Sequence, residues 1–400
     1  FFHPEGASGA EQASLWGHVD RALNVIGTRV IPGTRLAAYG HGDWNDSMQP
    51  FDPAMRERLC SAWTVTLHVQ TLNALAGALR SLGRNERASE FESTAAAVRE
   101  EFQRRLLVDG TVAGLAYFHE DGRVEYFLHP RDRSTGVSYS LLPMIHAVLH
   151  DLFTPEQARD HLELIRKRLT GPDGARLFDR PMMYRGGPQK HFQRAETAAF
   201  FGREIGLMYT HAHLRYAEAL ARYGDAEGFF LALCRANPVG IRALVPAATM
   251  RQANCYYSSS DAAFGDRYQA SAEYDRALRG EVPLDGGWRV YSSGAGIWTR
   301  LLFACLLGVS RRKSSLVFDP VIPRALDGLK AEMELEGRMF EITYRVRGEG
   351  SGPLSVNLNG DDLPFTREAN PYRTGAAEIP IRAVRERLRE EVNRMTVHLG

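Results

Sequence analysis

The sequence contains no uninterrupted apolar run approaching the roughly 20 residues that a membrane-spanning helix needs. It also has no excess of charge, because 49 Lys and Arg against 48 Asp and Glu give a formal net charge of +1. A field this weak excludes strong general attraction to nucleic acid or to an anionic membrane. Cysteine is scarce, and Cys60, Cys234, Cys255 and Cys305 follow no metal-ligand spacing. We expect buried free thiols in a reducing, cytoplasmic compartment.

What is present is ordinary globular composition, with 400 residues of which 44% are hydrophobic and 24% are charged. That length allows one large domain plus a smaller one. The first residues, Phe1-Phe2-His3-Pro4, include no starting Met and no signal peptide. We expect this chain to be part of a longer one.

Apolar residues recur at a helical period over most of the first 309 residues. From Asp52 to Gly83 the spacing predicts one helix, with Pro53 at its first turn and Gly83 at its end. A second helix is expected from Glu86 to Leu107, so the two form an antiparallel hairpin. Further helices are expected over Ser140–Asp151, Pro155–Leu169, Leu207–Tyr223, Ala226–Ala236 and Ile297–Val309.

Long segments rich in Gly, Pro and aromatic residues separate these helices, at 110–137, 171–203 and 238–296. Long loops on a compact scaffold are usually functional. Helix pairs with their loops at one end predict a mainly α helical toroid. After residue 313 the pattern changes to strand-like alternation, as in Lys330–Leu335 and Met339–Val346. We therefore expect a helical catalytic domain at 1–313 and a β-rich domain at 314–400.

The segment most suggestive of chemistry is Gly42-Asp43-Trp44-Asn45-Asp46, because Asp, Asn and Gly are poor residues for a core or a helix interior. Taken alone, it is compatible with an Asx turn in which both carboxylates bind their own backbone. The segment also resembles the GDWND signature of the cellobiose phosphorylase group, glycoside hydrolase family 94. That group includes the 1,2-β-oligoglucan phosphorylases and the C-terminal region of cyclic β-1,2-glucan synthases.

The resemblance implies an (α/α)6 barrel with β-rich domains and an inverting phosphorolysis of β-linked glucosides. Inversion requires one carboxylic acid that protonates the leaving oxygen, while phosphate replaces the activated water of a hydrolase. By the match, Asp46 is the general acid. Trp44 and Asn45 contact the sugar, and Asp43 orients the loop or binds a hydroxyl. No metal or organic cofactor is implied, and inorganic phosphate is the co-substrate.

A phosphate site is expected where Tyr291-Ser292-Ser293-Gly294-Ala295-Gly296 leads into an apolar helix. Free N–H groups and the helix dipole favour an anion at such a start. Family members bind phosphate with a Thr-Gly pair in this region, so Ser292, Ser293 and Gly294 are the candidates. A plain helix cap is the alternative explanation for the same residues.

The segment from Arg203 to His211 resembles the family's Glu-Asn-Gly-Gly…His segment, with Ile205 in place of Asn. The resemblance makes His211 a phosphate ligand and places Glu204 at the sugar site. His213 forms a His-x-His pair with His211, but no further metal-ligand cluster is evident, and we expect no zinc site. Gln252 lies where a family Gln approaches phosphate; its polar, aromatic segment could equally pack the barrel mouth.

One departure concerns the family's donor subsite, which uses an Arg-Asp segment upstream of GDWND that has no counterpart here. The leading hypothesis is a phosphorylase that releases α-glucose 1-phosphate from β-linked, preferably β-1,2-linked, gluco-oligosaccharides. An inverting hydrolase with Glu204 as base is the second hypothesis, and a non-catalytic glucan-binding module of a larger synthase is the third. The expected partners are the oligosaccharide and phosphate, with no nucleic acid and no membrane; related enzymes are often dimers, so a homodimer is one option.

Overall fold

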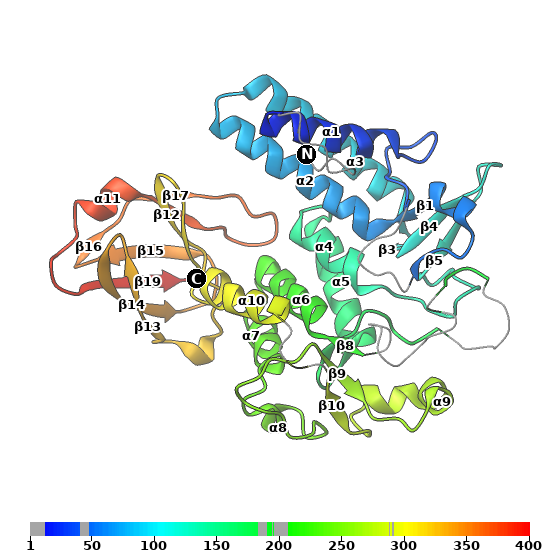
Figure 1. The fold of residues 1–400 in the computed structure, drawn as a ribbon. Coiled ribbons are helices and arrows are strands. Elements are labelled where there is room, and N and C mark those ends of the chain that lie inside the picture. Colours follow the sequence, from blue (N-terminus) through cyan, green and yellow to red (C-terminus); the bar gives the residue numbers. More distant parts are fainter. Residues whose placement is uncertain are drawn as a thin grey trace, which may run out of the picture.

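The computed structural model describes residues 13–40, 48–182, 190–193, 195, 207–287, 289 and 292–400. Helices occupy most of the first three hundred residues, and strands dominate the remainder (Figure 1). The helices are α1 (Leu15–Thr28), α2 (Ala62–Ser81), α3 (Asn85–Arg105), α4 (Leu141–Leu149), α5 (Pro155–Arg168), α6 (Thr210–Tyr223), α7 (Ala226–Arg235), α8 (Ile241–Leu244), α9 (Arg267–Leu278), α10 (Ser292–Leu301) and α11 (Ile381–Arg385).

Helix boundaries follow local capping chemistry. At the start of α5, the Thr154 hydroxyl accepts a hydrogen bond from the Gln157 N–H, and the Thr154 N–H donates to the Gln157 side chain at 3.0 Å. This reciprocal pair satisfies two N–H groups that the first turn leaves without partners. Helix α2 is followed by Gly83, whose φ of 72° lies in the left-handed region that ends helices.

Helix α4 packs against α2 on one side and against α6 on the other, and α10 packs against α6. Helices α3, α5 and α7 pack against α2, α4 and α6 as an outer layer. Among the described residues, the helices α2, α4, α6 and α10 do not close into a ring. After α10 a π-helical turn (Leu302–Leu306) leads into the C-terminal strands, and the chain does not pack back against α2 (Figure 1).

The predicted mainly α fold, an (α/α)6 toroid, is therefore wrong for the described residues, which combine an open helical array with several sheets. The segments expected to be irregular contain the short strands β3 (Thr111–Val112), β4 (Leu115–Phe118), β5 (Val124–Phe127), β7 (Gly174–Ala175), β9 (Ser259–Ala262) and β10 (Leu284–Gly286). Four more lie inside or at the ends of expected helices: β1 (Leu59–Ser61), β2 (Leu107–Val108), β6 (Thr170–Gly171) and β8 (Met208–Tyr209). Runs of two to four residues are too short for an alternating pattern to reveal them.

The expected helix from Asp52 is also wrong in its first part. A 3-10 turn (Pro53–Glu57) comes first and strand β1 follows, so helix α2 begins only at Ala62. Strand β1 pairs with β4, and tertiary pairing thus overrides the helical spacing of Met55 and Leu59. The expected helices corresponding to α3, α4, α5 and α7 are confirmed to within a few residues.

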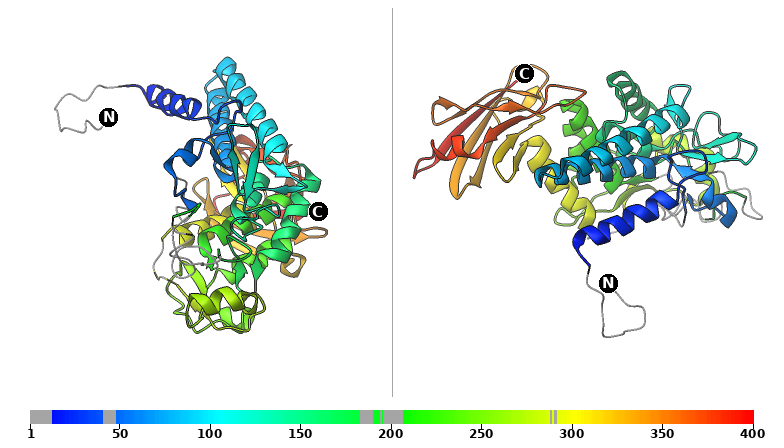
Figure 2. Two further views of the ribbon diagram at one scale, coloured as in Figure 1. Left: turned by 90° about the vertical axis from the view of Figure 1, so that its right-hand side faces the viewer. Right: turned by 90° about the horizontal axis from the view of Figure 1, so that it is seen from above.

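The C-terminal region forms two sheets, with strand orders β11-β12-β18-β17 and β13-β14-β19-β15-β16. Their strands are β11 (Val309–Arg311), β12 (Ser315–Phe318), β13 (Lys330–Leu335), β14 (Arg338–Val346), β15 (Pro353–Leu358), β16 (Asp361–Asp362), β17 (Thr366–Arg367), β18 (Ala377–Pro380) and β19 (Asn393–Leu399). Figure 2 shows both sheets at the end of the molecule opposite β4 and β5. The β-rich character after residue 313 is as predicted, and the domain boundary at 313/314 stays a prediction.

Alternation along β14 buries Phe340, Ile342 and Tyr344 on one face of the sheet. The Tyr344 hydroxyl donates to the Leu307 carbonyl at 2.7 Å, which fastens the larger sheet to the end of the helical region. Within the described ranges, no helix combines the length and the apolar character that crossing a membrane would require.

Helix α6 is anchored in the protein interior by His213, which is fully buried. Its Nδ1 accepts a hydrogen bond from the Ala175 N–H at 3.1 Å, and its Nε2 donates to the Ala232 carbonyl at 2.9 Å. The ring is therefore neutral, and burial lowers its pKa to about 4. Burial also lowers the pKa values of His150 and His161 to about 4.

These histidines predict acid lability. Between about pH 6.5 and 4 the unfolded chain binds protons that the folded chain does not, so stability falls as the pH is lowered through this window. Each of the three groups contributes about 1.4 kcal/mol per pH unit. Urea unfolding at several pH values should show this slope.

His213→Ala should lower the free energy of unfolding at pH 7 by about 2–5 kcal/mol, because two buried backbone groups lose their partners. It should also reduce the acid slope; an unchanged slope in His213→Ala would contradict the assignment.

Candidate active site

The structure places only some of the residues expected to act on substrate. The GDWND residues Asp43, Trp44, Asn45 and Asp46 lie outside the described residues, as does Glu204. Their roles remain predictions from the sequence. The described candidates are His211, Gln252 and Gly294, together with the backbone of Ser292 and Ser293.

A three-stranded sheet with the order β10-β9-β8 determines where two helices start. Strands β8 and β10 are both antiparallel to β9, and Met208 and Gly286 lie on either side of Ser260. The two outer strands consequently run in the same direction, about 10 Å apart. Helix α6 follows β8 directly, and the chain leaving β10 enters α10 at Ser292. The amino end of α6 and the segment that leads into α10 therefore leave the same edge of one sheet.

Helix α10 begins at Ser292, five residues before the start at Ile297 that apolar spacing predicts. The Ser-Ser-Gly sequence thus forms the first turn of the helix and does not precede it. In an α-helix the first N–H groups have no partner within the helix and carry the positive end of its dipole. An anion at this turn would meet backbone donors.

Close packing explains the glycines around this turn. A Cβ on Gly294 would lie 2.2 Å from the ring of Tyr256, and a Cβ on Gly287 would lie 2.0 Å from the Ser259 hydroxyl. Tyr256 itself is largely buried, and burial raises the pKa of its hydroxyl. Gly294 is therefore required for contact with Tyr256, a packing role that the sequence did not indicate; its predicted role in binding phosphate is separate and remains a prediction.

Gln252 is exposed and is held beside the segment entering α10. Its backbone N–H donates to the Tyr257 hydroxyl at 2.7 Å, and its side-chain oxygen accepts from Arg289 Nη1 at 3.1 Å. Arg289 also forms an isolated bridge with Tyr257. A cavity of about 200 Å³ lies next to this loop, lined among others by Asn254, Tyr256, Ala295 and Trp298.

His211 is the second residue of α6 and is half-buried, with its ring nearly parallel to that of Tyr209 at 6.2 Å. Burial lowers its pKa, and the positive charge of Arg215 lowers it further. The imidazole is therefore neutral at pH 7 and can donate one N–H. Two turns further along α6, Glu218 pairs with Arg215 and also with Arg300 of α10 at 2.6 Å, which joins the two helices.

The expected His-x-His pair does not act as a unit. Both ring nitrogens of His213 are engaged by the backbone of β7 and α7, while His211 lies at the helix start. Over the described ranges, no group of three or more His, Cys, Asp and Glu side chains could hold a metal ion.

Sequence reasoning missed a buried polar cluster at the base of this sheet. Asp173 and Arg176 are almost fully buried and pair at 2.8 Å. Asp261 on β9 lies near them, and burial raises the pKa of its carboxyl. Arg251 donates to the Ser260 hydroxyl at 2.9 Å and stacks over Tyr257. The only signal in the sequence is the unusual polarity of residues 251–261, which carries no information on the distant Asp173.

Comparisons with known proteins identify the class. Residues 308–394 match the glycoside phosphorylase C-terminal domain family. Over 371 residues, 92% of the chain, the sequence is 40% identical to a 1,2-β-oligoglucan phosphorylase of Listeria innocua serovar 6a. Over 361 residues, 90% of the chain, it is 24% identical to the cyclic β-(1,2)-glucan synthase NdvB of Rhizobium meliloti. These matches cover 33% and 12% of the two relatives, so the chain spans a third of their length or less.

The chain is thus related to the glycoside phosphorylases. More particularly, the relationship is to phosphorylases of the glycoside hydrolase family 94 type, and the resemblance carried by residues 42–46 is confirmed.

Solved structures add information on the fold alone. A sialidase superposes with a TM-score of 0.50 at 12% identity, covering 90% of this chain and 31% of the sialidase chain. A family GH78 rhamnosidase of Bacillus sp. GL1 gives a TM-score of 0.46 at 14% identity, covering 82% and 29%.

The two glycines in the first turns of α10 provide a matched test of the packing. Gly294→Ala should lower the free energy of unfolding by about 1–3 kcal/mol, because the new methyl group overlaps the Tyr256 ring. Gly296→Ala meets nothing within 4 Å and should instead raise it by up to about 1 kcal/mol, since Ala favours helix. Urea denaturation measures both; equal stability of the two variants would contradict the packing described here.

Proposed function

We propose that this chain is the portion of a larger glycoside phosphorylase that cleaves β-linked gluco-oligosaccharides, preferably β-1,2-linked, with inorganic phosphate. The 40% identity to an oligoglucan phosphorylase over 92% of the chain is the observation that carries the proposal. The common sheet edge from which α6 and the segment entering α10 depart also supports it, because His211 belongs to α6 and Ser292 to Gly294 belong to the start of α10.

In the proposed reaction Asp46 donates its proton to the glycosidic oxygen as the C1–O bond breaks. A phosphate oxygen forms the new bond to C1 from the opposite face, which inverts the anomeric configuration and gives α-glucose 1-phosphate. Asp46 is then reprotonated from solvent. Trp44 supplies an apolar surface for the sugar ring, and Asp43, Asn45 and Glu204 contact its hydroxyls.

Phosphate would be held by donors that bear no negative charge of their own. We assign this role to His211 and to the first turn of α10, Ser292 to Gly294, with Gln252 as a further contact. The neutral His211 donates one N–H, and phosphate bound there gains a charge-assisted hydrogen bond. The proposed reaction uses no metal and no organic cofactor.

We also propose a cytoplasmic location, supported by the four cysteines, all of which are free thiols. A homodimer remains a prediction that light scattering of the full-length protein can check.

Phosphate dependence tests the reaction class. The full-length parent protein, incubated with sophoro-, laminari- and cello-oligosaccharides, should release α-glucose 1-phosphate only when phosphate is present, and fastest from the sophoro series. Anomer-resolved NMR identifies the product. Asp46→Asn should lower kcat by about 10²–10⁴-fold, the usual contribution of a general acid.

Three outcomes would contradict the proposal. Formation of free glucose from the β-linked oligosaccharides in the absence of phosphate indicates a hydrolase. Glucan binding without turnover indicates a binding module. Unchanged turnover in Asp46→Asn would contradict the assignment of Asp46 as the general acid.

The phosphate ligand can be tested separately from the acid. His211→Asn should raise the KM for phosphate by about 10–100-fold, because a hydrogen bond to a charged group contributes about 1.5–3 kcal/mol. The KM for the oligosaccharide should change less than twofold. His18→Asn, an exposed control, should leave both constants unchanged. If the KM for the oligosaccharide rose as much as the KM for phosphate, the assignment of His211 as a phosphate ligand would be contradicted.

A further inference from the structure

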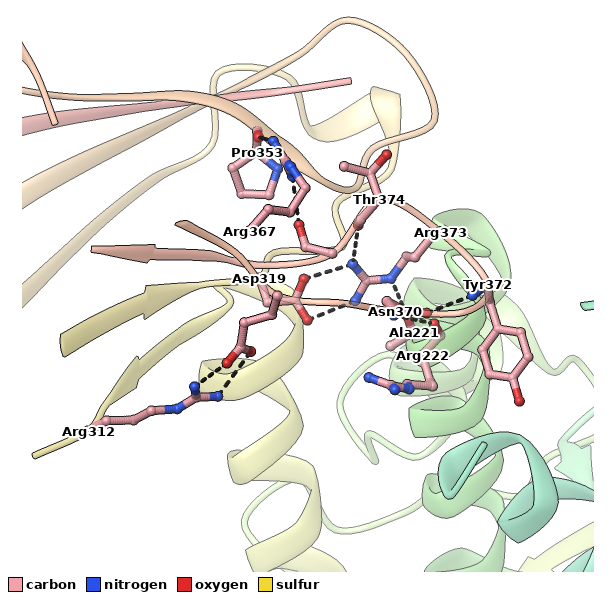
Figure 3. A network of polar contacts seen from close by, with 12 residues as sticks. Ala221, Arg222, Arg312, Asp319, Pro353, Arg367, Asn370, Tyr372, Arg373 and Thr374 are labelled. Carbon is pink, nitrogen blue, oxygen red and sulfur yellow. Dashed lines mark hydrogen bonds and ion pairs between the residues drawn. The ribbon is translucent and has the colours of Figure 1, made fainter. Parts of the chain in front are cut away.

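The segment that joins β17 and β18 in the C-terminal region reaches across to the far end of helix α6. Figure 3 shows Asn370, Tyr372 and Arg373 of this segment beside Ala221 and Arg222 in the last turn of the helix. This contact lies about 20 Å along the helix from its first residues. It connects the part of the chain that matches the phosphorylase C-terminal domain to the helix that bears His211.

The contact completes the hydrogen bonding of the helix end. The last carbonyls of an α-helix have no partner within it. Here the Leu220 carbonyl accepts from the Gly224 and Asp225 N–H groups, which is the usual local solution. The next two carbonyls are satisfied from outside, Ala221 by Arg373 Nε at 3.1 Å and Arg222 by Asn370 Nδ2 at 3.1 Å.

Arg373 is fixed on its other side by the β region. Its two terminal nitrogens donate to the two carboxylate oxygens of Asp319, just after β12, at 2.7 and 2.9 Å. Only 8% of the side chain is exposed, so this paired fork is largely shielded from solvent. The cation also lies at the negative end of the helix dipole, which adds to the attraction.

Two further features show that the fit is close. Gly224 has a φ of 102°, and a Cβ there would lie 2.9 Å from Cδ of Arg373. The Tyr372 hydroxyl donates to the Phe153 carbonyl at 3.3 Å in the turn between α4 and α5. The segment therefore contacts both the end of α6 and the turn between α4 and α5.

We infer that Arg373 is a positioning residue: by holding the carboxyl end of α6 it keeps His211, at the amino end, in place for phosphate. The functional part of this inference rests on the proposed phosphorylase activity. A helix of 14 residues moves as a rigid rod more readily than it bends, so freedom at one end displaces the other. A displaced His211 would form a weaker hydrogen bond to phosphate, so the effect should fall on the KM for phosphate.

Arg373→Met in the full-length protein removes both the paired hydrogen bonds to Asp319 and the hydrogen bond to the Ala221 carbonyl. We expect faster amide exchange at 207–215 as well as at 216–224, and a phosphate KM about three- to tenfold higher, equivalent to one lost hydrogen bond. The kcat at saturating phosphate and the KM for the oligosaccharide should stay within twofold. Arg373→Lys keeps the charge and should recover part of the loss.

Arg367→Met is the matched control. Arg367 donates to the carbonyls of Gly375 and Pro353 at 2.8 and 2.7 Å and so acts within the β region alone. It should leave amide exchange throughout α6 and the phosphate KM unchanged. If Arg373→Met proves too unstable to purify, Asn370→Ala, which removes only one of the two caps, carries the same test.

The inference is overturned if Arg373→Met speeds exchange only at 216–224 and leaves the phosphate KM as in Arg367→Met. A parent protein that shows no phosphorolysis at all refutes the proposed function instead. In that case the exchange at 207–215 still decides whether the β region positions the amino end of α6.

Discussion

Strand β9 is paired along both edges, and the rest of the candidate site depends on this double pairing. Because β8 and β10 are both antiparallel to β9, they run in the same direction, and each is followed by a helix that begins beyond the same edge. If either pairing slipped by one residue, the side chains of that strand would face the opposite side of the sheet. Backbone hydrogen bonds, more than side chains, therefore bring the start of α6 and the end of β10 to the same end of the sheet.

Close approaches of backbone to side chain hold this sheet in register. Gly286 and Gly287 lie against Tyr257 and Ser259 at distances that no Cβ would allow. Below them, the Asp173–Arg176 pair is buried, and desolvating two charges costs several kcal/mol that their attraction and hydrogen bonds must offset. Removing either partner alone would leave an uncompensated charge beside β9.

The helical and β regions are coupled at the opposite end of α6. The start of the helix is bound to the residue before β9, through the Thr210 N–H and the Ser258 carbonyl at 2.9 Å, and its end is bound to Arg373 and Asn370. In between, His213 and Glu218 attach it to α7 and α10. Arg373 and Asn370 are the attachments that the C-terminal region contributes to this helix. Through them the C-terminal region contacts the helix that bears the candidate residue His211.

The sequence by itself determined the helices whose apolar spacing and caps agree, as in α5, and the strands whose alternation is long enough to detect, as in β14. It also determined the relationship to the phosphorylases through residues 42–46. Tertiary structure decided the rest. The Ser-Ser-Gly sequence belongs to helix α10, although glycine disfavours helix, and the close contact of Gly294 with Tyr256 is visible only in the tertiary structure. Strands such as β8 and β10 form only because they pair with β9. The helices form an open array and not the expected closed toroid. Helical periodicity could not predict this, because it shows which face of a helix is buried but not which neighbour covers that face.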